Sequence, residues 1–162
     1  TVDDDFIQSP QPVSFSFKHL LARVMLTFKN SVTSSDIKVS IKNPSIIICS
    51  RAGVIETPIT NESKWSLYED DFFTGTATIS YSSYSGYYNE VPANGQLSTD
   101  YKFVIPIEGS TDEIGFLLQI TKGESSIESE EVISLNWNPE MGGSYNIVVD
   151  ITDEMIASIS KE

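Results

Sequence analysis

Hydrophobic and polar residues alternate in short runs along this chain, and this pattern predicts β-strands. From Val13 to Phe17 every second residue is hydrophobic, as expected for a strand buried on one face. A turn around residues 18–22 and a second strand ending at Phe28 are predicted next, because Val24, Leu26 and Phe28 alternate with Arg23, Met25 and Thr27. Asn30-Ser31 then ends the run as a turn would.

A helix is the alternative for the same stretch. Its hydrophobic residues also fall at helical spacing, at positions 17, 20, 21, 24, 25 and 28. A long helix would, however, place Leu26 on the polar face, and no N-cap residue stands immediately before Phe17. The strand interpretation is therefore preferred.

Further strands are predicted at 37–42, 45–49, 76–81, 101–107, 114–121, 131–137 and 145–151. Asn43-Pro44 is expected to separate the first two. Ser45–Cys49 is a continuous apolar run, typical of a strand buried on both faces, whereas Thr76–Tyr81 suits an exposed edge. Turn residues recur between the later runs. We therefore predict an all-β fold, an antiparallel two-sheet β-sandwich of about seven to nine strands.

The chain has 162 residues, which fits one domain. Residues 1–12 are expected to form an extended acidic lead that contains Pro10 and Pro12. The sandwich is predicted to span residues 13–152, followed by a C-terminal tail at 153–162. Because the sequence starts at Thr1, we expect it to be a processed or excised piece of a longer protein.

Two long connections interrupt the strand pattern, at residues 52–75 and 82–100. Connections of this length inside a compact domain often carry contacts. The second lies in a tyrosine-rich region, with Tyr81, Tyr84, Tyr87 and Tyr88 among Ser, Gly and Asn. Recognition loops have this composition, so these tyrosines are a candidate contact loop. The alternative is that their rings simply cover a sheet face.

Charge and composition exclude several functions. The net charge is −13, which repels nucleic acid and anionic membrane surfaces, and no apolar run is long enough to span a bilayer. His19 is the single histidine, so a histidine triad or a multi-histidine metal site is excluded. Cys49 lies in an apolar run and is expected to be a buried thiol. We expect no catalytic residues, no cofactor and no metal, although two-carboxylate hydrolysis stays formally open.

Two local patterns have weak functional interpretations. Glu69-Asp70-Asp71 is acidic, but it lacks the spacing of a calcium loop, and a solvated loop is the simpler interpretation. Asn61-Glu62-Ser63 matches the short glycosylation triplet.

Three landmarks resemble one known family. Residues 13–24, VSFSFKHLLARV, resemble the aliphatic-x-Phe-x-His-x-Leu-small-x-Val signature of the fimbrillin-like proteins of Bacteroides and relatives. Phe103-Val104-Ile105-Pro106 is similar to the family's aliphatic-aliphatic-Pro strand. Trp137 followed by Gly143-x-Tyr145 and a closing alternating strand is the third. Ile107 departs from the pattern, because Gln often follows the proline there.

The resemblance implies that this chain is the second of two transthyretin-like β-sandwich domains of an exported lipoprotein at the cell surface or outer membrane. Family members are shaft, anchor or tip subunits of surface pili, or related adhesins. Subunits assemble there by strand donation, a form of β-augmentation. The implied partners are other pilus subunits, together with a host or glycan ligand. Direct membrane insertion by this chain is not expected.

Two segments are candidates for assembly. One is the first strand, with Val13, Phe15 and Phe17, and the other is the tail, with Met155, Ile156 and Ile159. The alternative for the tail is a frayed end or a short capping turn. A different function also stays open: a carbohydrate-binding module of a glycan-uptake system, suggested by the tyrosine-rich loop and by Trp65 or Tyr68.

Overall fold

The computed structural model describes residues 19–50, 53–60, 62–67, 74–108, 111–152 and 156–161, with backbone alone at 49–50, 67, 74–75 and 156–161. The acidic lead, the predicted strand Val13–Phe17 and the Glu69–Asp71 cluster lie outside these residues. So do Asn61 and Tyr68, and nothing structural is said of the Cys49 side chain.

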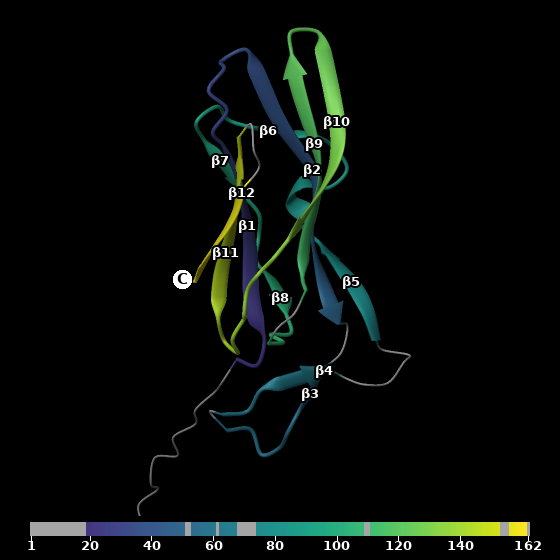
Figure 1. Ribbon diagram of the computed structural model, residues 1–162, viewed down its shortest axis with the longest axis vertical. Helices are drawn as coiled ribbons and strands as arrows, with labels where there is room; N and C mark the ends of the chain where they lie inside the picture. Colours follow the sequence, from purple (N-terminus) through teal and green to yellow (C-terminus); the bar gives the residue numbers. More distant parts are fainter. Residues whose placement is uncertain are drawn as a thin grey trace, which may run out of the picture.

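Two five-stranded sheets stand face to face (Figure 1). Sheet A has the order β12 (Ile156–Lys161), β11 (Ser144–Ile151), β1 (Ala22–Asn30) and β7 (Gln96–Ser98), and β8 (Lys102–Val104) also pairs with β1. Sheet B has the order β10 (Ser125–Ser134), β9 (Glu113–Lys122), β2 (Ile37–Ser50) and β5 (Thr74–Ser80), and β6 (Asn89–Val91) also pairs with β2. A separate hairpin joins β3 (Gly53–Ile55) and β4 (Trp65–Leu67), and a single 3₁₀ turn, η2, spans Ser82–Tyr84.

The predicted all-β sandwich is confirmed, and nearly every strand pair is antiparallel. The exception is central: β1 and β11 run parallel, from Arg23 opposite Ser144 to Asn30 opposite Ile151. The strands outnumber the predicted seven to nine, because the two long connections contain β3, β4, β6 and β7. These have three residues each, too few to show an alternating pattern.

Asn43-Pro44 does not end a strand, contrary to the prediction. β2 continues through it as a bulge, where the register with β9 shifts between Lys42 and Ser45 and Asn43 has a φ of 52°. Asn43 tolerates this left-handed backbone, and a bulge accommodates the missing N–H of Pro44. Ser45–Cys49 is also not buried on both faces as a run, since Ile46 and Ile48 are buried while Ile47 is half-buried.

Three other strand boundaries differ from expectation. β10 begins at Ser125 instead of Glu131 and ends at Ser134, so Leu135 and Trp137 follow the strand. β8 is limited to Lys102–Val104, with Ile107 forming an isolated bridge to Trp65. The predicted edge strand at 76–81 corresponds to β5, which does lie at the edge of sheet B.

The core lies between the sheets and confirms the predicted register of β1. Val24, Leu26 and Phe28 are fully buried, and the Phe28 ring packs edge-to-face on Phe116 of β9 with the ring centroids 4.9 Å apart. Met25 falls between these core positions and is half-buried. A helix is therefore excluded for residues 22–30.

The third family-like landmark forms a packed corner at the start of β11. Trp137 donates its indole N–H to the buried Asp112 carboxylate at 3.0 Å, and its ring meets Tyr145 edge-to-face at 5.2 Å. The Tyr145 hydroxyl accepts the Glu140 backbone N–H at 2.8 Å. Gly143 is required beside this ring, because an added Cβ would lie 2.5 Å from Tyr145 Cε2. The corner fixes the loop between β10 and β11.

Candidate interaction sites

The structure divides the four tyrosines of the predicted contact loop. Tyr81 is completely buried, and its hydroxyl donates to the Val24 carbonyl of β1 at 3.1 Å. Burial, with a smaller contribution from Asp100, raises the pKa of Tyr81. This ring belongs to the core. The prediction of Tyr81 as a contact residue is therefore wrong, because a buried ring cannot contact a ligand.

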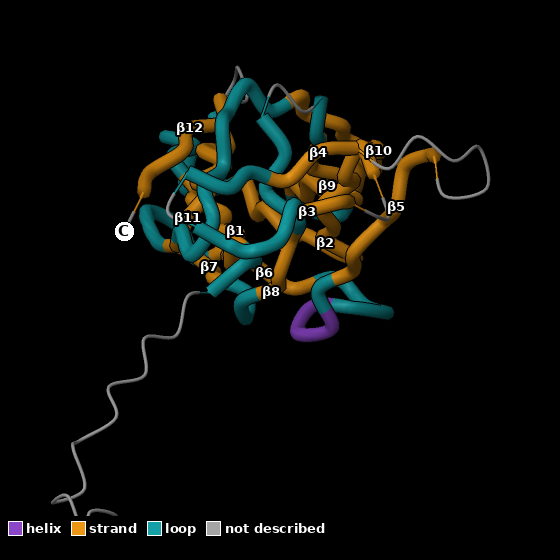
Figure 2. Tube along the Cα trace, turned by 90° about the horizontal axis from the view of Figure 1, so that it is seen from below, coloured by secondary structure: helices purple, strands orange, loops and turns teal. Residues whose placement is uncertain are grey.

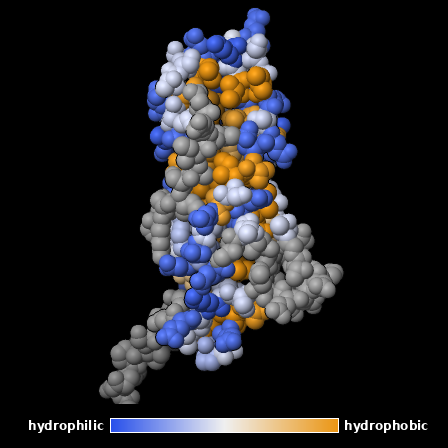
Figure 3. All heavy atoms as spheres, in the orientation of Figure 1, coloured by the Kyte–Doolittle hydropathy of each residue, from blue (hydrophilic) through white to orange (hydrophobic). Residues whose placement is uncertain are grey.

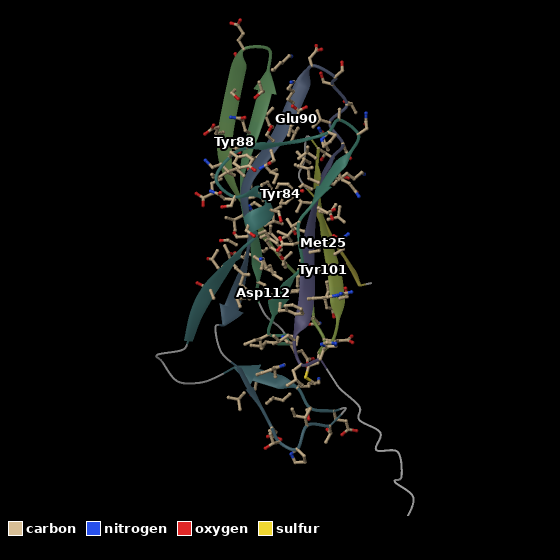
Figure 4. The ribbon with its side chains drawn as sticks, turned by 180° about the vertical axis from the view of Figure 1, so that it is seen from behind. Met25, Tyr84, Tyr88, Glu90, Tyr101 and Asp112 are labelled. Carbon is tan, nitrogen blue, oxygen red and sulfur yellow. The ribbon has the colours of Figure 1, made fainter. Side chains whose placement is uncertain are left out.

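Of the other three tyrosines, Tyr84 and Tyr88 lie at different heights on the molecule (Figure 4). Tyr84 in η2 is half-buried and donates its hydroxyl to the Ser98 carbonyl at 2.9 Å. Tyr88 is half-buried, its ring lies 5.4 Å from the Lys42 ammonium, and desolvation followed by the nearby Glu128 raises its pKa. Tyr87 is 66% exposed. The loop thus offers one free ring, with two rings engaged by the fold.

The long side of the sandwich that carries this loop is closed. The chain passes there from β6 on sheet B to β7 on sheet A, and side chains fasten the sheets together. The buried Asn30 amide donates to the Val91 carbonyl at 3.1 Å, and its oxygen accepts the Val32 N–H. The Tyr81 hydroxyl of the chain after β5 likewise reaches the Val24 carbonyl of sheet A. Within sheet A, Thr99 extends the pairing of β7 with β1, because its hydroxyl oxygen accepts the Leu26 N–H at 3.0 Å and its N–H donates to the Leu26 carbonyl at 2.9 Å.

On the opposite long side, between β10 and β12, no described strand lies between the two sheet edges, and we call this the open side. β10 is a ten-residue edge strand whose first six residues are all exposed. Its described side chains bond to β9, to β10 itself and, through Glu128, to Tyr88, and none of these bonds reaches sheet A. Figure 3 shows hydrophobic residues in a lengthwise band on the face where β10 lies, bordered by hydrophilic ones.

A row of aliphatic residues crosses sheet B near the hairpin of β9 and β10. Ile127, Ile120, Val39 and Val91 are directly opposite one another on β10, β9, β2 and β6. Their exposure falls along the row as 73%, 36%, 0% and 1%. The row therefore starts in the core and ends in solvent at the open side. The hydrophobic pattern of the sequence does not predict this exposed residue, because Ile127 is surrounded by Ser and Glu.

The predicted tail contains a strand. β12 pairs antiparallel with β11, with Ile156 opposite Asp150 and Ile159 opposite Ile147, while Met155 lies outside the described residues. β12 forms the last strand of sheet A on the open side. The other predicted assembly residues, Val13, Phe15 and Phe17, are outside the described part of the chain.

One end of the sandwich holds a pocket of about 390 Å³. The β3–β4 hairpin lies across this end (Figure 2) and borders the pocket together with the β10–β11 loop. The Trp65 ring forms the aromatic wall of the pocket. The sequence predicts Trp65 as a candidate glycan contact, so this residue of the pocket could be found from the sequence. The lining residues are Glu62, Ser63, Lys64, Trp65, Pro106, Glu108, Asn138, Pro139, Glu140 and Met141.

Other kinds of site were sought in the part of the chain that the structure describes. It contains no cluster of three or more His, Cys, Asp or Glu residues able to hold a metal ion. Within the same residues, no helix has the length and apolar character needed to cross a membrane. His19 is exposed at the start of the described chain.

Comparisons with known proteins find a similarity in structure. No family profile matches the chain, and no curated protein matches it significantly. The chain is similar to a solved structure of a "putative cell adhesion protein" from Bacteroides eggerthii, with a TM-score of 0.42 and 11% sequence identity. The similarity covers 89% of this chain and 56% of that one, so this chain spans little more than half of that protein's length.

Proposed function

We propose that this chain is a structural or adhesive subunit of a cell-surface fimbria or related surface adhesin, which joins its neighbours by strand addition at the open side. The role is non-catalytic, and the partners are other subunits of the same assembly. The observation that carries the proposal is the position of β12, which is the edge strand of sheet A beside the open side.

The geometry of β12 supports exchange between molecules. Its six register positions lie against β11, from Tyr145 opposite Lys161 to Asp150 opposite Ile156. A strand at a sheet edge can leave the sheet and be replaced by the equivalent strand of a neighbour, because the same backbone hydrogen bonds form again. Exchange therefore links subunits at little net cost in hydrogen bonding.

The open seam also supports this role. Exposed β-strand edges promote association unless they are protected, and β10 presents ten residues of edge. The Ile120 and Ile127 side chains beside it would gain from being covered. The family-like landmarks of the sequence are consistent with a pilus or adhesin, and in that setting the open edge is a joint between subunits.

The test is to lock β12 in place. Val148 and Ser158 are directly opposite one another, so cysteines at both positions, in a Cys49→Ser background, should form a cross-strand disulfide. We expect the unmodified chain to associate as its concentration rises in sedimentation velocity runs. The oxidised lock should stay monomeric, and reduction should restore association.

Deletion of residues 153–162 is the companion variant. We expect it to keep the β-sheet circular dichroism of the parent chain and to lose association, because β11 then has no strand to exchange. Two results would contradict the proposal: an unmodified chain that stays monomeric throughout, or an oxidised lock that associates as well as the unmodified chain.

The carbohydrate-binding alternative does not gain support from the tyrosine-rich loop as a whole. Tyr81 is in the core, and Tyr84 and Tyr88 are engaged by neighbouring groups. Any sugar contact therefore has to be sought elsewhere on the molecule.

A further inference from the structure

The pocket at the end of the sandwich is a site separate from the edges of β10 and β12. It is formed by three segments: the β3–β4 hairpin, the residues after β8, and the loop between β10 and β11. Its walls combine one aromatic ring, two buried prolines and a methionine with polar side chains. Ligand sites for small molecules have this mixture of apolar surface and a few convergent polar groups.

The aromatic wall is held in a fixed orientation. The indole N–H of Trp65 donates to the Leu20 carbonyl at 2.7 Å, and its backbone bridges both Ile55 and Ile107. Gly53 leaves room for the ring, since a Cβ there would lie 2.8 Å from Trp65 Cε3. A ring anchored in this way loses little freedom when a ligand stacks on it.

The opposite wall is equally well supported. Pro139 is buried, and the Glu140 backbone is held by the Tyr145 hydroxyl at 2.8 Å, in the corner that Trp137 and Gly143 complete. Asn138 lies in the same loop with its side chain exposed. The fold thus fixes an amide group and a carboxylate-bearing residue across from the indole.

The polar groups include both donors and acceptors. Lys64 and Glu108 form an ion pair at 2.7 Å, which raises the pKa of Lys64 and lowers the pKa of Glu108, so both stay charged at neutral pH. Asn138 can donate and accept, Ser63 carries a hydroxyl, and Glu62 and Glu140 accept. A ligand with hydroxyl groups matches this mixed set, because each hydroxyl also donates and accepts.

We propose that this pocket binds a neutral sugar, with one face of the ring against Trp65 and its hydroxyl groups on the polar rim. The C–H face of a sugar supplies the apolar surface that Trp65, Pro106 and Pro139 match. An anionic sugar is disfavoured by the −13 net charge and by three lining glutamates against one lysine. A cationic ligand would use the ring and the carboxylates, but it would be repelled by the Lys64 ammonium and could not accept a hydrogen bond from Asn138.

The experiment follows the two indole N–H signals by NMR. Trp65 borders the pocket, whereas Trp137 is 7% exposed and bound to Asp112. The probes are soluble oligosaccharides of glucose, galactose, mannose, fucose and N-acetylglucosamine, with sialyllactose and trilysine as charged comparisons. We expect at least one neutral sugar, at up to about 10 mM, to shift the Trp65 signal more than the Trp137 signal.

Variants then assign the contact. Trp65→Ala and Asn138→Ala should each weaken affinity for that sugar by about tenfold or more, measured by calorimetry. Tyr87→Ala, which removes an exposed ring outside the pocket, should leave the affinity for that sugar unchanged. Trp65→Phe keeps an aromatic ring and replaces Trp65→Ala if the latter unfolds the hairpin, as judged by its thermal transition.

Three results would overturn the proposal: no neutral sugar in the panel shifts the Trp65 signal, only trilysine or sialyllactose does so, or binding is indifferent to both Trp65 and Asn138. The β12 lock is placed at positions 148 and 158, whereas the described pocket lining belongs to the β3–β4 hairpin, the residues after β8 and the β10–β11 loop. Failure of sugar binding and failure of strand exchange are therefore distinguishable.

Discussion

The two long sides of this sandwich are built differently. On the side of β6 and β7, the sheets are fastened by side chains that reach across to backbone groups, among them Asn30 and Tyr81. On the side of β10 and β12, the described β10 side chains bond to β9, to β10 itself and to Tyr88, and none of these bonds reaches sheet A. Val91 is buried on the first side, and Ile127 is exposed on the second.

This difference suggests that the two long sides have different roles, one in the stability of the fold and the other in association with another molecule. Buried polar groups that bridge two sheets stabilise one arrangement, because losing a partner leaves a desolvated group behind. An edge without such bridges adds little to stability but leaves a surface available to another molecule. The closed side thus holds the two sheets together, and the open side is where we propose that a neighbour adds a strand.

The largest effect is expected where both sides share the core. Phe28→Ala should lower the free energy of unfolding by about 3–5 kcal/mol, because it removes a fully buried ring that packs on Phe116. Urea denaturation measures the change. Val132→Ala, at a residue that is 53% exposed on β10, is the control and should cost under about 0.5 kcal/mol. Similar losses for the two variants would refute the assignment of core and edge.

A smaller effect should distinguish the two sides directly. Asn30→Ala removes the bond to the Val91 carbonyl and the acceptor for the Val32 N–H, and should cost about 1–3 kcal/mol. Its counterpart on the open side is Ser126→Ala, which removes an exposed hydroxyl pair with Thr121 and should cost under about 0.5 kcal/mol. Thermal and urea unfolding of both variants provide the measurement; equal costs would show that the closed side is no better fastened.

The smallest effect concerns a carboxylate at the margin of the closed side. A hydrogen bond from Ser83 at 2.7 Å, followed by the contribution of Lys102, lowers the pKa of Asp100. Ser83→Ala should therefore raise that pKa toward its ordinary value, as measured by NMR titration of the carboxyl carbon. Ser85→Ala is the matched control. An unchanged pKa in Ser83→Ala would show that the serine does not stabilise the charge.

The same change has a defined effect on stability. Because the pKa of Asp100 is lower in the folded state, its ionised form adds stability at neutral pH, and this contribution disappears as the pH falls through the lowered value. Ser83→Ala should accordingly destabilise the chain slightly at neutral pH and not in strong acid. The Asp100 side chain is exposed, so the difference should be small.

Strands with a clear alternating pattern could be predicted from the sequence. β1 and β11 have buried residues at every second position, and the hydrophobic residues of their sequences fall at these same positions. The first half of β10 could not be found, because it is polar on both faces and is held by backbone pairing with β9. The bulge at Asn43-Pro44 was missed for a related reason: local turn propensity predicts a break, whereas pairing with β9 on both sides of it keeps the strand intact.

The candidate sites were less predictable than the fold. Composition identified the tyrosine-rich loop, but burial of Tyr81 depends on where its backbone crosses the core, which composition does not specify. The end pocket brings together residues near positions 64, 107 and 139, so the sequence could indicate Trp65 as a candidate but not its neighbours. The parallel pairing of β1 with β11 has no local signal, since both strands would look the same in an antiparallel sheet.

That parallel pair has a consequence for the order in which the molecule can be made. It joins residues 22–30 to residues 144–151, so the centre of sheet A cannot form before residue 144 has been synthesised. Contacts between such distant segments close large loops, which slows folding. Until then, β1 lacks the neighbour that pairs with its whole length.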